Sequence, residues 1–392
     1  MQQSRSNFVT IPGLVILFVL ALAAAYAGIG LLFAAITALF LLCLMSRLWA
    51  EGSLKKLDFG MDGKDICGFP GDELSLPVRI SNDKLLPVVW LSADLGIGED
   101  ECVAPKDGSE AVFSWIMPRQ KLSWDEPLKA LRRGVLRIPS ADLVSGDGFG
   151  LAWTASTVKL SEDMEIYVFP SILPADITVL TRRLSEMEAY SKGRYTDPTL
   201  VKSTVPYSPG EGVRDISWRL LAKQGELLVN KKEKLDTRRM CLVPDFESFS
   251  YETATETGSG AAAVFHVHKE AFEHMLSLAA SVIDKASSSG IRCSLVLPGC
   301  GNRGAEIIVP EEAELQAETL LRALAEVEYE GGECVLPCAR MMDEYHKLGQ
   351  FFCLTASPKE SMERLAGLEA PVWYISSGEA ADHVIPEEDI LR

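Results

Sequence analysis

The N-terminal part of this 392-residue sequence lacks charge. From Phe8 to Met45 no side chain is formally charged and nearly all are apolar, which excludes an ordinary water-soluble N-terminal segment and indicates membrane sequence. One helix through the whole run would be about 57 Å long at about 1.5 Å per residue, whereas the hydrocarbon core of a bilayer is roughly 30 Å thick. Two membrane spans therefore fit the run better than one.

Glycines in Ala27–Gly30 divide the apolar run, because they tolerate a tight reversal of the chain. We predict a transmembrane helical hairpin in residues 1–50. Its first span lies near Ile11–Tyr26 and its second near Ile29–Leu48.

Basic residues flank both ends of this hairpin. Arg5 precedes the first span, and Arg47, Lys55 and Lys56 follow the second, so the positive-inside bias places both ends in the cytoplasm. We expect a multi-pass protein of the cell membrane whose soluble domains are cytoplasmic. The alternative is a signal peptide cleaved after Ala25–Ala27, with the second run as an anchor and the soluble part outside.

Positive charge is scarce in the sequence as a whole. Lys and Arg number 38 against 55 Asp and Glu, a net charge of −17, so we expect no nucleic-acid binding. The nine cysteines have no regular spacing, which argues against a disulfide framework and agrees with the cytoplasm. Cys334 and Cys338 form a lone C-x3-C, which we interpret as structural rather than zinc-binding.

Catalytic motifs are missing too. The sequence has no G-x-S-x-G elbow and no H-E-x-x-H motif. Of its five histidines, His266, His268 and His274 lie close in sequence but lack the spacing of a helical metal pair. We expect no enzyme, no catalytic residues and no cofactor. A hydrolase or transferase with dispersed catalytic residues remains an alternative.

Residues 57–172 have the pattern of a β-sandwich. In the stretch LSLPVRIS, apolar and polar residues alternate from Leu74 to Ser81, which predicts a strand with one buried face. The stretches VVWLSADL, AVFSWIM, GVLRI and EIYVFP follow as further strands at suitable intervals. Because Pro77 has no backbone N–H to donate, we expect the first of these strands at a sheet edge.

Residues 173–238 form a basic connector. From Arg182 to Met240 there are 13 Lys and Arg against 8 Asp and Glu, whereas from Arg292 onward 8 basic residues accompany 19 acidic ones. Asp215 and Gly225 are candidate caps of a helix over Ile216–Gln224.

This helix has two interpretations. In the first, its apolar side chains anchor a packed helix and its basic side chains are merely solvated. In the second, basic side chains form a docking patch for an acidic surface of the same chain or of a partner. A phosphate loop in SPGEGVRD is disfavoured because the lysine and hydroxyl of the P-loop pattern are missing. The apolar anchors are Ile216, Trp218, Leu221 and Ala222, and the docking residues are Arg214, Arg219 and Lys223.

Residues 239–392 alternate strand-like and helical runs. The stretches MCLVPDF, RCSLVLP, FFCLTAS and VWYISS read as buried strands. Between them, AFEHMLSLAASVIDKASSSG, EEAELQAETLLRALAEVE and the region Lys359–Leu368 read as helices. This rhythm predicts an α/β domain, Rossmann-like in architecture, with a mainly parallel sheet covered by helices on both faces.

The stretch YSPGEGVRDISWRLLAKQGELLVNKKE resembles the signature of a bacterial membrane-anchored family catalogued as domain of unknown function number fifty-eight. Upstream, RRGVLRIPSADLVSGDGFGL and YVFP resemble further stretches of that family, so the resemblance covers most of residues 1–245. Glu211, Lys223 and Gly148 depart from the family pattern, where Asp, Arg and Pro are usual. The matching signature residues are Tyr207, Pro209, Gly210, Arg214, Ile216, Trp218, Ala222, Gly225, Leu227, Val229 and Glu233.

The resemblance implies that residues 239–392 form a von Willebrand factor type A-like domain, and that the gene often lies beside one for a MoxR-type AAA+ ATPase. It implies no established enzymatic activity. Such a domain usually opens with D-x-S-x-S, whose oxygens bind Mg²⁺. Here DFESF keeps Asp245 but has Glu247 and Phe249 where the hydroxyls belong. Asp245 and Glu247 are therefore the candidate metal ligands of a degenerate site.

We therefore expect a non-enzymatic scaffold or adaptor, tethered to the membrane, that binds a protein partner, with an AAA+ ATPase as the candidate. The alternative is divalent-metal-dependent ligand binding through Asp245 and Glu247.

Overall fold

The structure is a computed structural model of the chain, and it divides into two compact units, Met1–Pro170 and Ser171–Arg392, which we take in turn. The residues that the structure describes are 3–5, 9–61, 63–98, 102–106, 110–160, 164–190, 196–208, 216–234, 239–257, 260–301, 304–312, 314–344, 348–368, 371–377 and 383–391.

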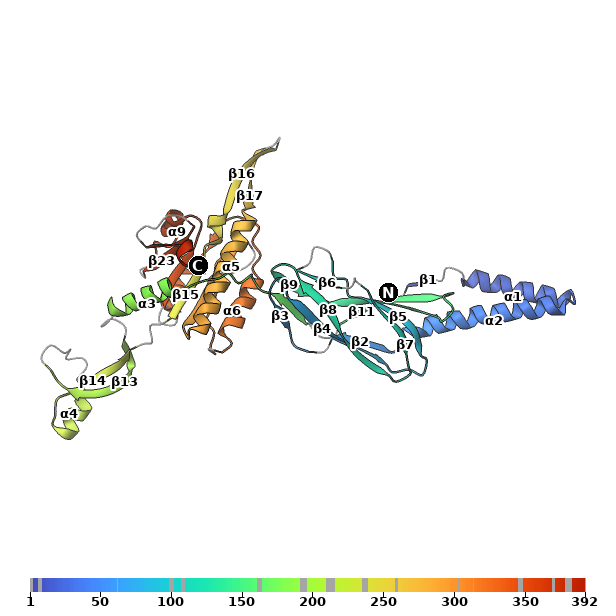
Figure 1. The fold of residues 1–392 in the computed structure, drawn as a ribbon, viewed down its shortest axis with the longest axis horizontal. Coiled ribbons are helices and arrows are strands. Elements are labelled where there is room, and N and C mark those ends of the chain that lie inside the picture. The colour runs from blue at the N-terminus through green and yellow to red at the C-terminus, as the bar shows by residue number, and fades with distance from the viewer. Residues whose placement is uncertain are drawn as a thin grey trace. The chain divides into compact units, whose positions relative to one another are not determined.

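Two apolar helices, α1 (Ile11–Tyr26) and α2 (Gly30–Ser53), form an antiparallel hairpin (Figure 1). Gly28 adopts a φ of +71° between them, a left-handed conformation that glycine accepts without strain. Within the described part of the chain, α2 is the one helix that is long and apolar enough to cross a membrane. At 16 residues α1 is apolar but shorter, about 24 Å against a hydrocarbon core of roughly 30 Å.

Helix α2 continues past the predicted end at Leu48 to Ser53. Its last turns are buried at Ser46, Ala50 and Ser53 and contact two strands of the following β-sandwich. Gly52 also lies close to the loop before β5, where an added Cβ would be 3.0 Å from Cδ2 of Leu86. The apolar helix and the β-sandwich are thus joined without a flexible linker.

The rest of the first unit is a β-sandwich built of a five-stranded sheet in the order β1-β11-β10-β5-β7 and a four-stranded sheet in the order β2-β4-β8-β6, with a smaller sheet β3-β12-β9 (Figure 1). Apolar side chains from these strands form one continuous core. The strands are β1 (Gln3–Arg5), β2 (Leu57–Met61), β3 (Ile66–Gly68), β4 (Glu73–Asn82), β5 (Val88–Asp94), β6 (Val103–Pro105), β7 (Glu110–Ile116), β8 (Lys121–Ala130), β9 (Gly134–Arg137), β10 (Ser140–Gly146), β11 (Trp153–Lys159) and β12 (Glu165–Val168).

Strand β4 has the predicted alternation of buried and exposed residues, but the prediction that it lies at a sheet edge is wrong. It pairs with β2 on one side and with β8 on the other. Pairing with β2 stops at Met61 opposite Val78, so Pro77 lies just beyond the last pair. A proline is tolerated there because no β2 residue needs its missing N–H.

The second unit begins with the connector and continues into an α/β domain. Its elements are α3 (Thr178–Tyr190), β13 (Thr196–Pro206), α4 (Trp218–Gln224), β14 (Leu228–Lys234), β15 (Arg239–Pro244), the short 3-10 helix η2 (Phe246–Phe249), β16 (Ser250–Thr257), β17 (Gly260–Val267), α5 (Lys269–Ser288), β18 (Arg292–Leu297), β19 (Gly299–Cys300), β20 (Glu306–Ile308), α6 (Gln316–Ala325), β21 (Cys334–Val335), α7 (Cys338–Asp343), β22 (Gln350–Leu354), α9 (Pro358–Arg364), β23 (Val372–Ser376), β24 (Val384–Pro386) and η3 (Glu387–Asp389).

The connector contains a two-stranded sheet, β13 with β14, and α4 lies in the loop between its strands. The helix begins at Trp218 and not at the predicted Ile216, which instead bridges to Val229 in β14. Ser217 stands at its N-terminal end, and the predicted N-cap Asp215 lies outside the described residues. The helix ends as predicted at Gly225, whose φ of +73° closes it.

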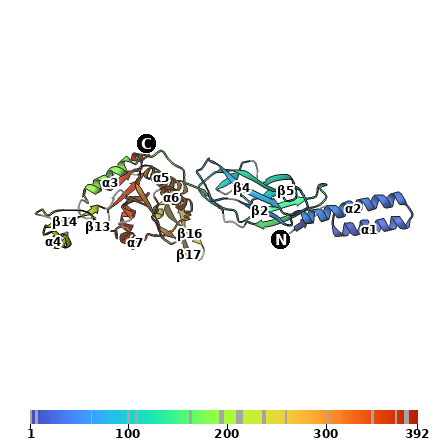
Figure 2. The ribbon, with the colours of Figure 1, turned by 90° about the horizontal axis from the view of Figure 1, so that it is seen from below.

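The α/β domain has a six-stranded sheet in the order β20-β18-β15-β22-β23-β24. All its pairings are parallel except that of the edge strand β20. Strands β15 and β22 are buried almost throughout, as expected for a parallel sheet covered on both faces. Helices α5 and α6 pack side by side, and α9 contacts β23 (Figures 1 and 2).

A hairpin that we did not predict, β16 with β17, lies between η2 and α5. It places His266 on a strand and His268 just before α5, where both rings contact Tyr251. Nε2 of His274 contacts Oε1 of Glu387. Two of these histidines therefore share an aromatic partner and the third contacts a different residue, so the three do not converge on one point.

Candidate functional site

The candidate site lies at the carboxyl ends of the two central strands, β15 and β22. Strand β18, the next strand of the sheet along the chain, pairs with one side of β15, whereas the later strand β22 pairs with its other side. The strand order therefore reverses between β15 and β22. In open parallel sheets, ligands bind at such a reversal, beyond the carboxyl ends of the strands. Asp245 follows β15 directly, and its N–H donates to the carbonyl of Leu354 at the end of β22, 2.9 Å away. Thr355 follows β22.

Asp245 is buried, and hydrogen-bond donors surround its carboxylate. Arg364, the last residue of α9, places Nη2 2.5 Å from Oδ2 of Asp245. Ser361, one turn earlier on the same helix, donates from Oγ to the same oxygen. Thr355 Oγ1 lies 2.6 Å from Ser361 Oγ and accepts from the N–H of Ser357. A chain of hydrogen bonds therefore ties α9 to the end of β15.

Glu247, in η2, meets the same guanidinium from another direction. Its Oε1 lies 3.3 Å from Nη1 of Arg364, and its Oε2 accepts from the N–H of Cys334 at 3.3 Å. Burial opposes the charge of the guanidinium, but the hydrogen bond and attraction of Asp245 and the attraction of Glu247 raise the pKa of Arg364 above its usual value. One arginine thus bridges both candidate metal ligands.

As they lie, these residues do not fit a divalent cation. The structure brings Asp245 and Glu247 together, but the groups that face their oxygens are donors: a guanidinium, a hydroxyl and a backbone N–H. A magnesium ion needs six oxygen ligands around it and no competing cation. In the described part of the chain, no group of three or more His, Cys, Asp or Glu side chains could hold a metal ion.

The two serines of DFESFS do not act as substitutes for the missing metal ligands. Ser248 Oγ donates to the carbonyl of Asp245 and accepts from the N–H of Ala356, and Ser250 Oγ donates to the carbonyl of Glu247. Both hydroxyls therefore hold the backbone of η2 in place. Phe249, at the other hydroxyl position, is buried and packs edge-on against Phe272.

A disulfide adjoins the site. Cys300 in β19 is bonded to Cys334 in β21, across 34 residues of sequence. Cys334 is also the residue whose N–H contacts Glu247. Cys334 is therefore paired with Cys300, and Cys338, the other cysteine of the C-x3-C, is a free thiol.

The signature residues lie in a different place, around α4. The backbone N–H of Tyr207 donates to the carbonyl of Leu227, which brings the two ends of the loop together. Tyr207, Trp218 and Leu227 are exposed, Trp218 by 60%. The predicted packing of the helix is thus wrong for Trp218 and Ala222, which are exposed, and holds for Ile216, which is buried.

The basic residues Arg219 and Lys223 are exposed on α4, one turn apart. Pro209, Gly210 and Arg214 lie outside the described residues. We call the exposed set the connector tip, which consists of Tyr207, Trp218, Arg219, Lys223 and Leu227.

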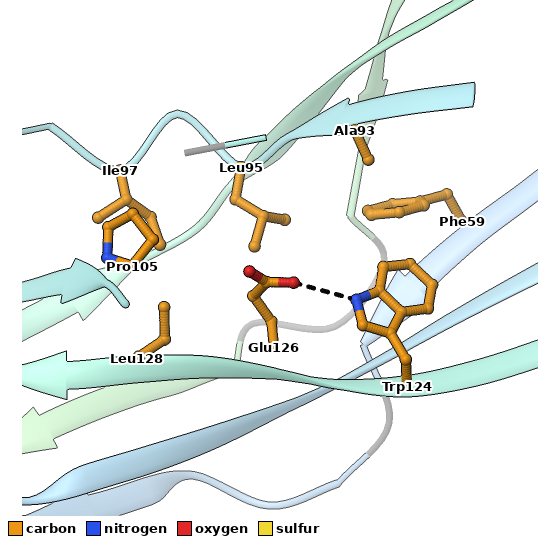
Figure 3. A pocket seen from close by; sticks show the side chains of 8 residues that line it. All are labelled: Phe59, Ala93, Leu95, Ile97, Pro105, Trp124, Glu126 and Leu128. Carbon is orange, nitrogen blue, oxygen red and sulfur yellow. Dashed lines mark hydrogen bonds between the residues drawn. The ribbon is translucent and has the colours of Figure 1, made fainter. Parts of the chain in front are cut away.

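The β-sandwich contains a mainly apolar crevice (Figure 3). Its one ionisable group is Glu126, whose carboxylate accepts a hydrogen bond from Nε1 of Trp124 at 3.2 Å. The rest of the lining is apolar, so the crevice offers neither a nucleophile nor a base beside that carboxylate. Its other lining residues are Phe59, Ala93, Leu95, Ile97, Pro105 and Leu128.

Comparison with known proteins adds little to this geometry. No protein-family model matches the sequence. An uncharacterized protein of Bacillus subtilis (strain 168), YeaD, is 22% identical over 259 residues, which is 65% of this chain and 58% of that protein. The match therefore spans less than two thirds of the relative. A solved late embryogenesis abundant (LEA) protein is 12% identical and covers 30% of this chain and 83% of its own, but the TM-score of 0.16 carries no argument.

Sequence reasoning found Asp245 and Glu247 but missed Arg364 and Ser361, which are 119 and 116 residues away from Asp245. Both lie on one face of α9, three residues apart. The spacing S-x-x-R at the end of a short helix is too common to indicate an ion pair with a distant strand.

Proposed function

We propose that this protein is a membrane-anchored adaptor that binds a protein partner through the connector tip. The observation that carries the proposal is the exposure of Trp218 beside Arg219 on α4. Tryptophan, tyrosine and arginine are the residues that most often dominate the binding energy of protein interfaces. Their exposure leaves Tyr207, Trp218 and Arg219 accessible to a partner.

The positive charge of the connector indicates what kind of partner surface it binds. The segment from Arg182 to Met240 has five more basic than acidic residues in a chain whose net charge is −17. A basic patch beside aromatic side chains fits an acidic protein surface with an apolar pocket. From the family resemblance we propose a MoxR-type AAA+ ATPase as that partner.

The remaining parts of the proposal concern the framework. Both helices of the hairpin cross the cell membrane, and the β-sandwich and the second unit lie on its cytoplasmic side. The α/β domain acts as a von Willebrand factor type A-like module. Its mainly parallel sheet, with Asp245 directly after the first strand, supports that assignment. Basic residues at both ends of the hairpin support the orientation.

The test is the affinity of the detergent-solubilised full chain for the purified ATPase. We expect Trp218→Ala, and the double variant Arg219→Glu with Lys223→Glu, each to weaken binding by tenfold or more, since hot-spot truncations cost about 2 kcal/mol or more. A matched control reverses two exposed lysines of the β-sandwich, Lys121→Glu with Lys159→Glu, and should bind as the wild type does.

Membrane extraction of all variants should be unchanged, because the hairpin is intact. Equal affinity of the wild type and the connector-tip variants would refute the docking role. Loss of binding in the lysine control as well would show that only the total charge matters.

A further inference from the structure

The carboxylate site at the ends of β15 and β22 already contains a cation that belongs to the chain. Nη2 of Arg364 contacts Asp245 and Nη1 contacts Glu247, at 2.5 and 3.3 Å. The arginine side chain is 24% exposed and the Asp245 side chain 5%. A carboxylate buried to this degree needs a compensating charge close by.

The guanidinium matches this place better than a metal ion does. Its planar fork directs separate N–H groups, on Nη1 and Nη2, at the two carboxylates in a fixed geometry, whereas an ammonium group is a compact charge on a single nitrogen. The remaining donors, Ser361 Oγ and the N–H of Cys334, occupy further lone pairs of the same carboxylates. For a divalent ion to enter, Arg364 would first have to leave.

We infer that Arg364 is the resident cation of this site and takes the place of a divalent metal, so that Asp245 and Glu247 serve as the receptor for α9 and not as metal ligands. The arginine neutralises one of the two carboxylate charges and fastens the end of α9 to the sheet. Arg364 consequently blocks metal binding by these two carboxylates, and a single substitution of Arg364 should permit it. The inference stands independently of the adaptor role.

The experiment compares metal binding by the detergent-solubilised full chain with and without Arg364. Wild-type protein should give no heat with Mn²⁺ or Mg²⁺ in calorimetry and no change in Tm. Arg364→Ala should lower the Tm by several degrees, because it leaves two carboxylates facing each other. Added Mn²⁺ should bind to this variant and restore part of the lost Tm.

Three controls make the result specific. Arg364→Ala combined with Asp245→Asn should lose the Mn²⁺ response. Arg322→Ala, which removes a half-buried arginine paired with Glu318 on α6, should show none. Arg364→Lys keeps the charge without the fork, so it should fold even if Arg364→Ala does not, and its Tm should lie below that of the wild type and stay insensitive to Mn²⁺.

Binding of Mn²⁺ to the wild type that Asp245→Asn abolishes would overturn the inference. So would an Arg364→Ala variant that folds and takes up no more Mn²⁺ than the wild type. If Arg364→Ala fails to fold, a Tm of Arg364→Lys equal to that of the wild type would overturn it in the same way.

Discussion

At the scale of single residues, Lys84 shows how a charged side chain in a half-buried position can donate to a backbone carbonyl. Its ammonium donates to the carbonyl of Ser53, one of the carbonyls that the end of α2 leaves without a helical partner. Burial lowers the pKa of Lys84 to about 8. The charged form is therefore less favourable in the folded protein than in the unfolded chain.

This shift predicts how stability depends on pH. The unfolded chain holds the Lys84 proton up to its ordinary pKa of about 10.4, whereas the folded protein releases it near 8. Between these values the unfolded state binds more protons, so the contribution of Lys84 to stability rises with pH across this window and is constant below it. Lys84→Met removes the ionisable group. Thermal unfolding in detergent from pH 7 to pH 10 should show the Tm of the wild type rising relative to that of the variant as pH increases. A Tm difference that does not change with pH would disprove the assignment.

At the scale of elements, the bond between β19 and β21 holds the loop that presents the N–H of Cys334 to Glu247. These strands have two residues each and, among the residues that the structure describes, pair with one another alone. Two residue pairs make a marginal sheet in water. The disulfide is therefore a main constraint on this part of the site.

Breaking the bond should destabilise the α/β domain. For a closed loop of 34 residues, the chain-entropy model gives about 3–4 kcal/mol. Cys300→Ser and Cys334→Ser should each lower the Tm, and the double variant should be no worse than either, because one bond is lost in all three. Cys338→Ser, at a free thiol, is the control and should unfold like the wild type. Additive losses in the double variant would show that the thiols act separately.

At the scale of the whole molecule, the side of the membrane on which the α/β domain lies decides whether the Cys300–Cys334 bond is formed or reduced. Disulfides persist in oxidising compartments and are kept reduced in the cytoplasm. The basic residues around the hairpin favour the cytoplasm, whereas the bond favours the exterior. The two indications therefore compete, and we give priority to the charges because they act on the hairpin directly.

Fusions at the carboxyl terminus of the full chain test this orientation. A green fluorescent protein fusion should be fluorescent and an alkaline phosphatase fusion inactive, since the β-sandwich and the second unit are proposed to be cytoplasmic. Thiol labelling of protein quenched with acid should then find Cys300 and Cys334 reduced in cells. An active phosphatase would contradict the orientation, and it would assign the disulfide a permanent structural role.

The sequence predicts the local elements well where periodicity and caps agree. Helix α1 has the predicted bounds, α4 ends at Gly225, and the amphipathic α5 occupies its predicted segment. These elements depend on neighbouring residues, so a short window contains the necessary information.

What the sequence does not reveal depends on distant contacts. The pairing of β4 on both sides depends on where β2 ends, and the partner of Cys334 cannot be deduced from spacing. The cation between Asp245 and Glu247 comes from a helix more than a hundred residues later. We assigned no strand or helix to the residues of β16 and β17, so this hairpin was not predicted.

The unbroken course of α2 from its apolar part into the β-sandwich has a mechanical consequence. In a bilayer, a helix tilts when the thickness of the hydrocarbon layer changes. With Ala50 and Ser53 buried against strands, that tilt rotates the sandwich by the same angle. If α2 crosses the membrane as proposed, lipid composition thereby sets the angle between the β-sandwich and the membrane plane.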